Sequence, residues 1–350
     1  MLTAARRVCF TRAALMAAPD LLTNLLRDVS RSFYLTMRVL PAPVRRQIGL
    51  AYLLARATDT IADTKIVSME LRLQGLRELR ERILSPGKSG ALNFGTITSQ
   101  QGLPAERVLL ERIEEALAVL QTFSTADQKL IRDVLAIITS GQELDLQRFA
   151  GASESNIVSL RDEGELDDYT YRVAGCVGEF WTRICRAHLF PKAPLDEATL
   201  MKNAVRFGKG LQLVNILRDL PKDLREGRCY LPAEKLREVG LVPADLLNPE
   251  NISKLRPLYD KHLTAAQAFL AAGWDYTNAL PYGQMRVRLA CAWPILIGAK
   301  TLGRLRTGNV LDATQRIKIS RADVRRVIIR SVLTYPWPPA WRRLFRQSLN

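Results

Sequence analysis

Apolar residues recur along most of the chain at intervals of three and four positions, with charged residues between them. Residues 103–123 carry Val108, Leu109, Ile113, Leu117 and Leu120 at this helical spacing. Residues 126–149 repeat the pattern, and Ser124, Thr125 and Asp127 at its start offer oxygens that can cap a helix. Alternation of polar and apolar residues, which is typical of strands, is scarce. The pattern therefore predicts helices over both segments and an all-α fold.

Clusters of turn-forming residues separate these helical stretches. They lie at residues 41–43, 85–90, 151–155, 191–194 and 248–250. No long linker rich in serine and glycine divides the chain, and no internal repeat is present. We predict one all-α domain over residues 21–330. A basic N-terminal extension at residues 1–20 precedes it, and a tail at residues 331–350 rich in proline, tryptophan and arginine follows it.

Composition narrows the class of protein. The chain has 350 residues, of which 47% are hydrophobic and 25% charged, as in ordinary globular proteins. Its five cysteines are scattered without metal-binding spacing, and two histidines, His188 and His262, are too few for a histidine metal site. No uncharged apolar run approaches the roughly 18 residues that a transmembrane helix needs. We expect a cytoplasmic protein with reduced cysteines.

The net charge is +16, from 51 lysines and arginines against 35 acids. A field of this sign attracts nucleic acid, an anionic membrane surface or phosphate-bearing small molecules. A basic helical nucleic-acid-binding protein is therefore one hypothesis, and a simple solvated basic surface is another. Charge alone does not decide between them.

Two segments place acids on one face of a helix. At about 100° per residue, Tyr52, Arg56, Asp59 and Asp63 share an arc of about 60°. Asp59 and Asp63 are four residues apart, so their Cβ atoms lie roughly 6 Å from each other. Carboxylates at this separation repel unless a cation lies between them. Mg²⁺ fits, because it prefers oxygen and is held by one or two carboxylates together with substrate phosphates.

The second segment repeats this arrangement with Gln212, Asn215, Asp219 and Asp223, which share an arc of about 80° if the segment is helical throughout. Pro221 lies inside it and predicts a distorted last turn. One such acid pair is common on surface helices, but two copies set among apolar residues indicate metal binding. Nearby arginines could bind a diphosphate or could simply pair with the aspartates. They are Arg31, Arg56, Arg218, Arg225 and Arg228.

A third segment, residues 169–181, has two glycines inside a helical pattern. Gly175 and Gly178 cost helix stability relative to alanine, so they indicate either close packing of another helix or a groove for a ligand. Tyr169 stands at its start as a candidate proton donor or acceptor. A buried, hydrogen-bonded tyrosine is the alternative.

Together with residues 30–34 (Ser-Arg-Ser-Phe-Tyr) and 227–232, these segments resemble the squalene/phytoene synthases in order and spacing, over roughly residues 25–300. The resemblance implies the isoprenoid-synthase fold, a helical bundle with a central active-site cavity. It implies that two facing aspartate helices hold Mg²⁺ and prenyl diphosphates. It also implies head-to-head condensation of two molecules of farnesyl diphosphate.

The resemblance assigns roles to individual residues. The metal ligands would be Asp59, Asp63, Asn215, Asp219 and Asp223, and Tyr169 would act in catalysis beside the four aspartates. The residues that would bind substrate are Ser30, Arg31, Phe33, Tyr52, Arg56, Val173, Gly178, Gln212, Asn215, Arg218 and Arg228. Aromatic residues could shield carbocations from water or could belong to the core. They are Phe33, Tyr34, Phe180, Trp181 and Phe207.

Within the family, Asp59-Thr60 and residues 291–294 and 317–321 resemble the squalene synthases. There the lysine that matches Lys318 is associated with NADPH, so NADPH is an expected cofactor by resemblance. Other family products remain alternatives: phytoene, dehydrosqualene or presqualene diphosphate. A non-catalytic assembly factor on this fold is disfavoured by the presence of all four aspartates.

The tail suggests a peripheral contact with a membrane. Trp337, Trp341 and the basic residues 342–346 could dock on an anionic bilayer, or the segment could pack on the domain. We expect no nucleic-acid partner, because organised acidic faces repel a phosphate backbone. The sequence gives no signal for an oligomeric state.

Overall fold

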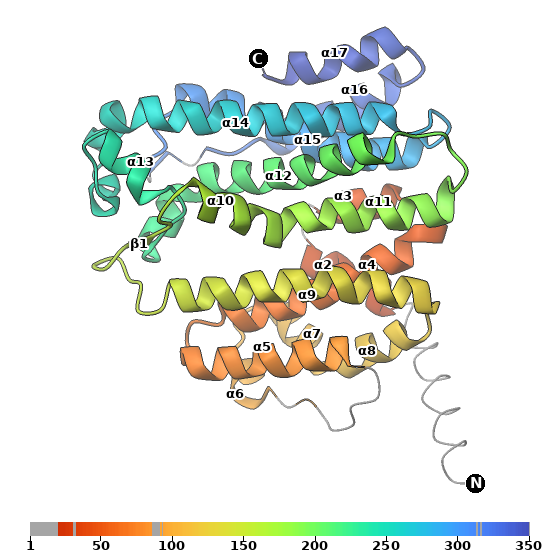
Figure 1. Cartoon of the computed structure of the whole chain (residues 1–350), viewed down its shortest axis with the longest axis horizontal. Coiled ribbons are helices and arrows are strands. Elements are labelled where there is room, and N and C mark those ends of the chain that lie inside the picture. Colours follow the sequence, from red (N-terminus) through yellow and green to blue (C-terminus); the bar gives the residue numbers. More distant parts are fainter. Residues whose placement is uncertain are drawn as a thin grey trace. The chain divides into compact units, whose positions relative to one another are not determined.

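The computed structural model describes residues 20–30, 33–85, 92, 94–312, 314–315 and 317–349. These residues are almost entirely helical, which confirms the all-α prediction (Figure 1). Arg31, residues 86–90 of the predicted turn at 85–90, and all but the last residue of the predicted basic extension lie outside them. None of the described helices is long and apolar enough to cross a membrane. No disulfide joins cysteines of the described chain.

The chain forms two compact units. The first contains the described residues up to Gln147 together with Arg183–Pro191. The second contains Arg148–Thr182 and the described residues from Lys192 onward. The grouping of both in one domain over residues 21–330 stays a prediction.

The first unit is built around α4 (Ala42–Asp63), which begins after Pro41 and contacts α5 (Met69–Leu84), α7 (Pro104–Glu111) and α8 (Ile113–Gln121). Its core includes Leu50, Leu53, Leu54, Ile61 and Leu76, none of which is exposed. The remaining elements are η1 (Leu21–Leu25), α2 (Leu26–Ser30), α3 (Phe33–Val39), α6 (Gly95–Ser99) and α9 (Thr125–Arg148), whose last residue belongs to the second unit.

Two of the predicted helices have different outcomes. The helix predicted at 126–149 is confirmed as α9, and the Ser124 hydroxyl accepts a hydrogen bond from the Asp127 amide at 3.1 Å. The helix predicted at 103–123 is instead two helices, because the backbone leaves helical geometry at Arg112. The Arg112 side chain is held there by ion pairs with Asp20 and Glu115.

The second unit has three long helices side by side: α12 (Glu197–Arg225), α14 (Ile252–Ala279) and α15 (Met285–Thr307) (Figure 1). Two short strands, β1 (Val158–Ser159) and β2 (Arg228–Cys229), pair in parallel. The other elements are α10 (Glu163–Thr170), η2 (Tyr171–Gly175), α11 (Cys176–Leu189), α13 (Ala233–Glu238), η3 (Pro243–Leu247), η4 (Pro249–Asn251), α16 (Arg321–Thr334) and α17 (Pro338–Leu349). The last turns of α11 belong to the first unit.

Close helix packing explains the glycines of the third sequence segment. A Cβ atom on Gly178 would lie 2.1 Å from the Ala204 carbonyl oxygen of α12. A Cβ atom on Gly208 would meet the Ala174 carbonyl oxygen at the same distance. The backbone of α12 therefore touches that of residues 174–178 at two points, and only glycine permits this approach. Packing, one of the two explanations left open by the sequence, accounts for Gly178.

Helix α12 continues through Pro221 to Arg225, so the last turn expected to be distorted is helical. Proline has no N–H, and the carbonyl four residues earlier therefore lacks its helical donor. That carbonyl belongs to Leu217, and the buried Tyr259 hydroxyl of α14 donates to it at 2.8 Å. A side chain from the neighbouring helix thus replaces the missing backbone hydrogen bond.

The C-terminal tail packs on the second unit through Trp341. This side chain is 2% exposed, stacks on Trp274 at 5.1 Å and donates to the Asn278 side-chain oxygen at 2.9 Å. The Arg288 guanidinium lies 5.6 Å from the Trp341 ring and 5.4 Å from that of Tyr335. Of the two alternatives that the sequence left open for the tail, packing on the domain therefore holds for Trp341, and its ring is not available for docking on a membrane. Trp337, by contrast, is 63% exposed.

The Tyr259–Leu217 hydrogen bond predicts the effect of Tyr259→Phe. The variant leaves a buried carbonyl without a donor, which costs about 1–3 kcal/mol of unfolding free energy. Chemical denaturation should show this loss. The control is Tyr282→Phe, since Tyr282 is 53% exposed and its hydroxyl donates only a long hydrogen bond, 3.3 Å, to the Tyr335 carbonyl, which water can replace. Equal stability of the two variants would contradict the role assigned to Tyr259.

Candidate active site

The first acidic face lies on α4. Its buried side carries Leu53, Leu54, Ala57 and Ile61, so helical periodicity turns Arg56, Asp59 and Asp63 away from the core. The Arg56 guanidinium pairs with the Asp59 carboxylate at 2.5 Å. The sequence-predicted grouping of these side chains on one face is present in the structure.

Glu106 of α7 is a member of this face that sequence reasoning missed. Its side chain is almost fully buried and accepts a second charged hydrogen bond from Arg56. A signal existed in the sequence, since Glu106 occupies a position on the apolar stripe that continues through Leu110, Ile113 and Leu117. An acid on a buried stripe needs a cationic partner, and Arg56 supplies it.

The electrostatics of this face favour a bound cation. The surrounding protein and the nearby Asp63 carboxylate together raise the pKa of Asp59 to about 7, against the lowering effect of Arg56. The Asp59 side chain is 41% exposed, so a ligand can reach it. A carboxyl group crowded in this way holds a proton until a positive charge replaces it.

The other predicted residues of the first unit lie beside this face or outside the described chain. Phe33 stacks on Tyr52 with ring centroids 5.0 Å apart, and Tyr52 donates weakly to the Val29 carbonyl at 3.5 Å. The buried Ser30 hydroxyl donates to the Leu26 carbonyl of its own helix. Because its hydrogen is used in this bond, the Ser30 hydroxyl can only accept a hydrogen bond from a substrate. Arg31 is outside the described residues.

The second acidic face lies on α12 and, like the first, combines two aspartates with an arginine. Arg218 binds the neighbouring Asp219 carboxylate through two nitrogens, at 2.5 and 2.8 Å. Burial and the Asp219 charge raise the pKa of Asp223 to about 7, and Lys222 offsets this only in part. Asn215 is exposed and Gln212 half-buried on the same helix. Each face thus has two aspartates on one helix, one of them with a raised pKa, beside an arginine.

An aromatic stack stands beside the second face. Tyr169 lies flat on Tyr230 at 4.7 Å, Phe149 meets the Tyr230 ring edgewise at 5.2 Å, and Arg228 lies over Phe149 at 5.7 Å. Arg228 also lies close enough to lower the pKa of Asp223. Tyr230 was missed in the sequence, although it follows Arg228 by only two residues.

The β1–β2 pair fixes this stack in place. Val158 is in register with Arg228, and Gly227 adopts a φ of +79° that favours glycine. A Cβ atom on Gly227 would lie 2.2 Å from the Ser153 amide nitrogen. The turn at 227 therefore needs glycine both for its backbone angle and for the close approach of the Ser153 loop.

The remaining predicted residues are placed as follows. Val173 lies half-buried in η2. Phe180 is 5% exposed and belongs to the core of the second unit, whereas Phe207 is half-buried and packs on Gly273 and Tyr276. Lys318 is exposed, and its carbonyl oxygen accepts a hydrogen bond from Arg304.

The donor set fits Mg²⁺. Among the residues that the structure describes, no three acids, histidines or cysteines form a closed metal cluster. Each acidic face offers a pair of carboxylates, and Mg²⁺ is typically bound by one or two carboxylates that leave positions for phosphate oxygens. The two faces belong to different units, and their convergence on one cavity stays a prediction.

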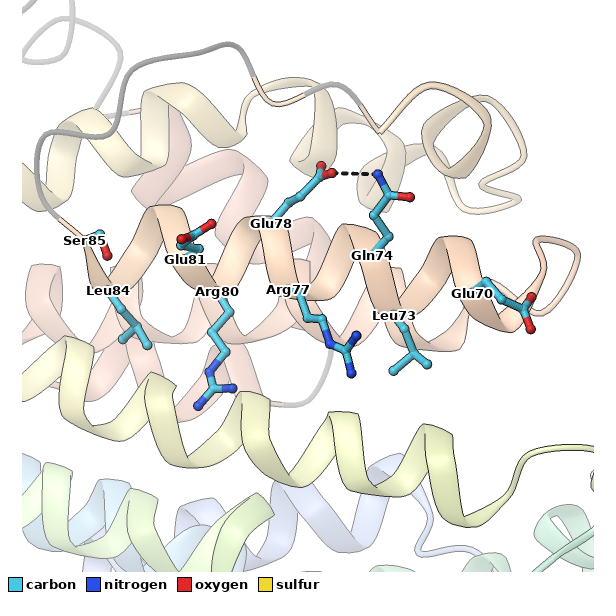
Figure 2. Close-up of a pocket in the computed structure, with 9 residues that line it drawn as sticks. All are labelled: Glu70, Leu73, Gln74, Arg77, Glu78, Arg80, Glu81, Leu84 and Ser85. Carbon is cyan, nitrogen blue, oxygen red and sulfur yellow. Dashed lines mark hydrogen bonds between the residues drawn. The ribbon is translucent and has the colours of Figure 1, made fainter.

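A separate hollow of about 620 Å³ runs along α5 (Figure 2). Arg77 and Arg80 point to the same side of the helix in Figure 2, and both pair with Glu143 of α9, at 2.5 and 3.5 Å. None of the residues predicted from the sequence lines it.

Comparison with known proteins gives consistent matches. A family model described as squalene/phytoene synthase matches residues 26–323. A presqualene diphosphate synthase of Rhodopseudomonas palustris is 33% identical, over 61% of this chain and 62% of that protein. The bifunctional lycopene cyclase/phytoene synthase of Blakeslea trispora is 28% identical, over 79% of this chain and 43% of that protein. The squalene synthase of Saccharomyces cerevisiae is 27% identical, over 71% and 55%. The chain thus spans less than two thirds of the length of these relatives.

Solved structures share the fold. The structure of TcSQS with the ligand E5700 aligns with a TM-score of 0.75 at 22% identity, over 94% of this chain and 90% of that one. A dehydrosqualene synthase complex aligns with a TM-score of 0.64 at 19% identity, over 92% and 99%. The similarity confirms the isoprenoid-synthase type of all-α fold.

The raised pKa values predict that the carboxylates destabilise the metal-free protein. A carboxyl group whose pKa is near 4 when unfolded and about 7 when folded costs stability as the pH rises through that window. Asp59→Asn and Asp223→Asn should therefore raise the melting temperature without Mg²⁺, more at about pH 8 than at about pH 5.

Differential scanning fluorimetry with and without Mg²⁺ measures this effect. Mg²⁺ should stabilise the unaltered chain at the higher pH and the two Asn variants much less. Asp133→Asn, on an exposed ion pair of α9, serves as the control. Lower melting temperatures for both metal-free Asn variants would argue against strained acidic faces.

Proposed function

Because the chain belongs to the squalene/phytoene synthase family, we propose that it condenses two molecules of farnesyl diphosphate head to head to presqualene diphosphate and reduces this intermediate with NADPH to squalene. The family comprises prenyltransferase-like enzymes of isoprenoid biosynthesis. One observation carries the proposal: two helices each present a carboxylate pair, one member with a raised pKa, beside an arginine. This is the chemistry that binds a metal diphosphate.

Departure of a diphosphate needs positive charge around its oxygens. The residues that would hold Mg²⁺ are the four aspartates and Asn215; when bound, the ion supplies positive charge to the leaving group. Arg56 and Arg218 add guanidinium donors suited to phosphate oxygens. In the described structure both are paired with aspartates, so exchange of carboxylate for phosphate accompanies substrate binding in the proposal.

The allylic cation left by ionisation is attacked by the double bond of the second farnesyl chain. Closure of the cyclopropane ring then releases one proton from carbon. Tyr169 is the proposed group for this proton transfer. Its ring is oriented by the Tyr230 stack, whose faces also favour a nearby cation and exclude water.

A second candidate product is presqualene diphosphate itself. The presqualene diphosphate synthase match supports it, because its 33% identity exceeds the 27% of the yeast squalene synthase. Thr60, one basis for favouring squalene, is 1% exposed and belongs to the core side of α4. Its identity therefore reflects packing and bears only weakly on the product.

Product analysis tests the reaction. The purified chain is incubated with farnesyl diphosphate and Mg²⁺, with and without NADPH, and the extract is separated by chromatography. Presqualene diphosphate should accumulate without NADPH, and squalene should form with it. Asp59→Ala and Asp219→Ala should each abolish turnover, a loss of about a thousandfold or more, with unchanged helix content. Full turnover by either variant would refute a shared role for the two faces.

Lys318 gives a sharper test of the reductive step. Its exposed amino group carries the proposed NADPH contact, so Lys318→Gln should slow squalene formation while presqualene diphosphate still accumulates. Arg237→Gln, an exposed change far along the sequence, controls for loss of charge. If Lys318→Gln slows both half-reactions equally, the residue does not serve the cofactor.

A further inference from the structure

Helix α16 has an exposed face that the proposed chemistry does not use. Its inner side is held by Val327, which is buried, and by Ser331, whose hydroxyl accepts a hydrogen bond from the Trp293 indole of α15 at 2.9 Å. The outer side leaves Ile329 50% exposed and Leu333 63% exposed. Because the inner contacts fix the rotation of the helix, this apolar exposure is a defined surface.

Arginines flank these apolar residues. At about 100° per residue, Ile329 and Leu333 form a ridge one turn long, Arg325 lies about 40° to one side and Arg326 about 20° to the other. Arg330 continues the second flank. We call Ile329, Leu333 and the three arginines the α16 ridge. An apolar strip with arginines on both sides, here Arg325 on one side and Arg326 and Arg330 on the other, is typical of helices that lie in a membrane interface.

Further apolar side chains are exposed on α16 and in the connection that follows it. Trp337, in the connection to α17, is 63% exposed, and Val332 is 39% exposed. Residues 321–349 contain seven arginines and a single acid, Asp323. That acid is bound by Arg304 at 2.7 Å and Arg326 at 3.3 Å. Of the three ridge arginines, Arg326 is thus paired with an acid, while no ion pair among the described residues offsets the charges of the exposed Arg325 and Arg330.

We propose that the α16 ridge docks the protein on an anionic lipid bilayer. Ile329, Leu333 and Trp337 would enter the interface, and the arginines would contact lipid phosphates. A second copy of the chain is a poorer occupant, since a two-fold contact through the ridge would bring arginines against arginines. The proposal uses residues outside both acidic faces, so it stands whatever the reaction product is.

Co-sedimentation of the full chain with vesicles tests the docking. Vesicles of equal parts phosphatidylcholine and phosphatidylglycerol should bind the protein, and vesicles of phosphatidylcholine alone should bind it weakly. The double variant Ile329→Ser/Leu333→Ser should lower the partition constant about tenfold or more. The matched control, Val242→Ser/Leu247→Ser, removes side chains that are 50% and 38% exposed elsewhere in the same unit and should bind normally.

The charge contribution has its own variants. Arg325→Gln/Arg326→Gln/Arg330→Gln should weaken binding to the anionic vesicles about a hundredfold, at about 1 kcal/mol per arginine near the surface. Removal of three exposed charges elsewhere, by Arg237→Gln/Lys254→Gln/Lys261→Gln, should have a much smaller effect. Equal losses for the two triple variants would mean that net charge, not the ridge, drives binding.

Trp337 reports contact directly. Its fluorescence should shift to the blue on binding, and Trp337→Phe should remove most of the shift. Three results would overturn the proposal: equal binding to the two vesicle types, unchanged binding of the Ile329→Ser/Leu333→Ser variant, or a dimer in light scattering that this variant abolishes. Binding to soluble polyglutamate as tight as to vesicles would point to an acidic protein instead. Circular dichroism of each variant verifies that it is folded.

Discussion

The repulsion between carboxylates set one helical turn apart is the constraint on which the candidate site depends. Each acidic face keeps an arginine within its own surface. On the first face Arg56 pairs with Asp59, whose pKa is raised despite this partner; on the second face Arg218 pairs with Asp219, and the pKa of Asp223 is raised. The arrangement costs stability and persists because the surrounding core holds it. In the proposed function, Mg²⁺ bound together with a diphosphate would supply the positive charge that lowers this repulsion, so folding of the acidic faces and metal binding would be coupled.

Contacts with neighbouring elements hold each acidic face in position. In the first unit, Arg56 extends from α4 to the buried Glu106 of α7, so the acidic face is tied to a second helix. In the second unit, glycines bring α11 and α12 into backbone contact, and Gly227 admits the loop that carries Ser153. Small residues and single hydrogen bonds therefore determine where Asp223, Arg228 and Tyr169 lie.

The sequence predicted what a single helix determines. The period of the α-helix places Asp59 with Asp63 and Asp219 with Asp223 without any knowledge of neighbouring elements. Site residues supplied by other elements were not predicted. Glu106 comes from a different helix, and Tyr230 follows a short strand whose partner is distant in sequence. The break at Arg112 and the burial of Trp341 also depend on tertiary partners. Periodicity does not encode these contacts.

The hydrogen bond from Tyr259 to the Leu217 carbonyl links the identities of two positions that are far apart in the chain. In a chain that replaced Pro221 by a residue with an amide hydrogen, that amide would donate to this carbonyl within α12. The hydroxyl of Tyr259 would then no longer be needed as its donor. A chain that kept the proline but lost the hydroxyl would carry an orphaned acceptor beneath its acidic turn. The two sites are thus epistatic, and the order in which substitutions arrive decides which ones selection can tolerate.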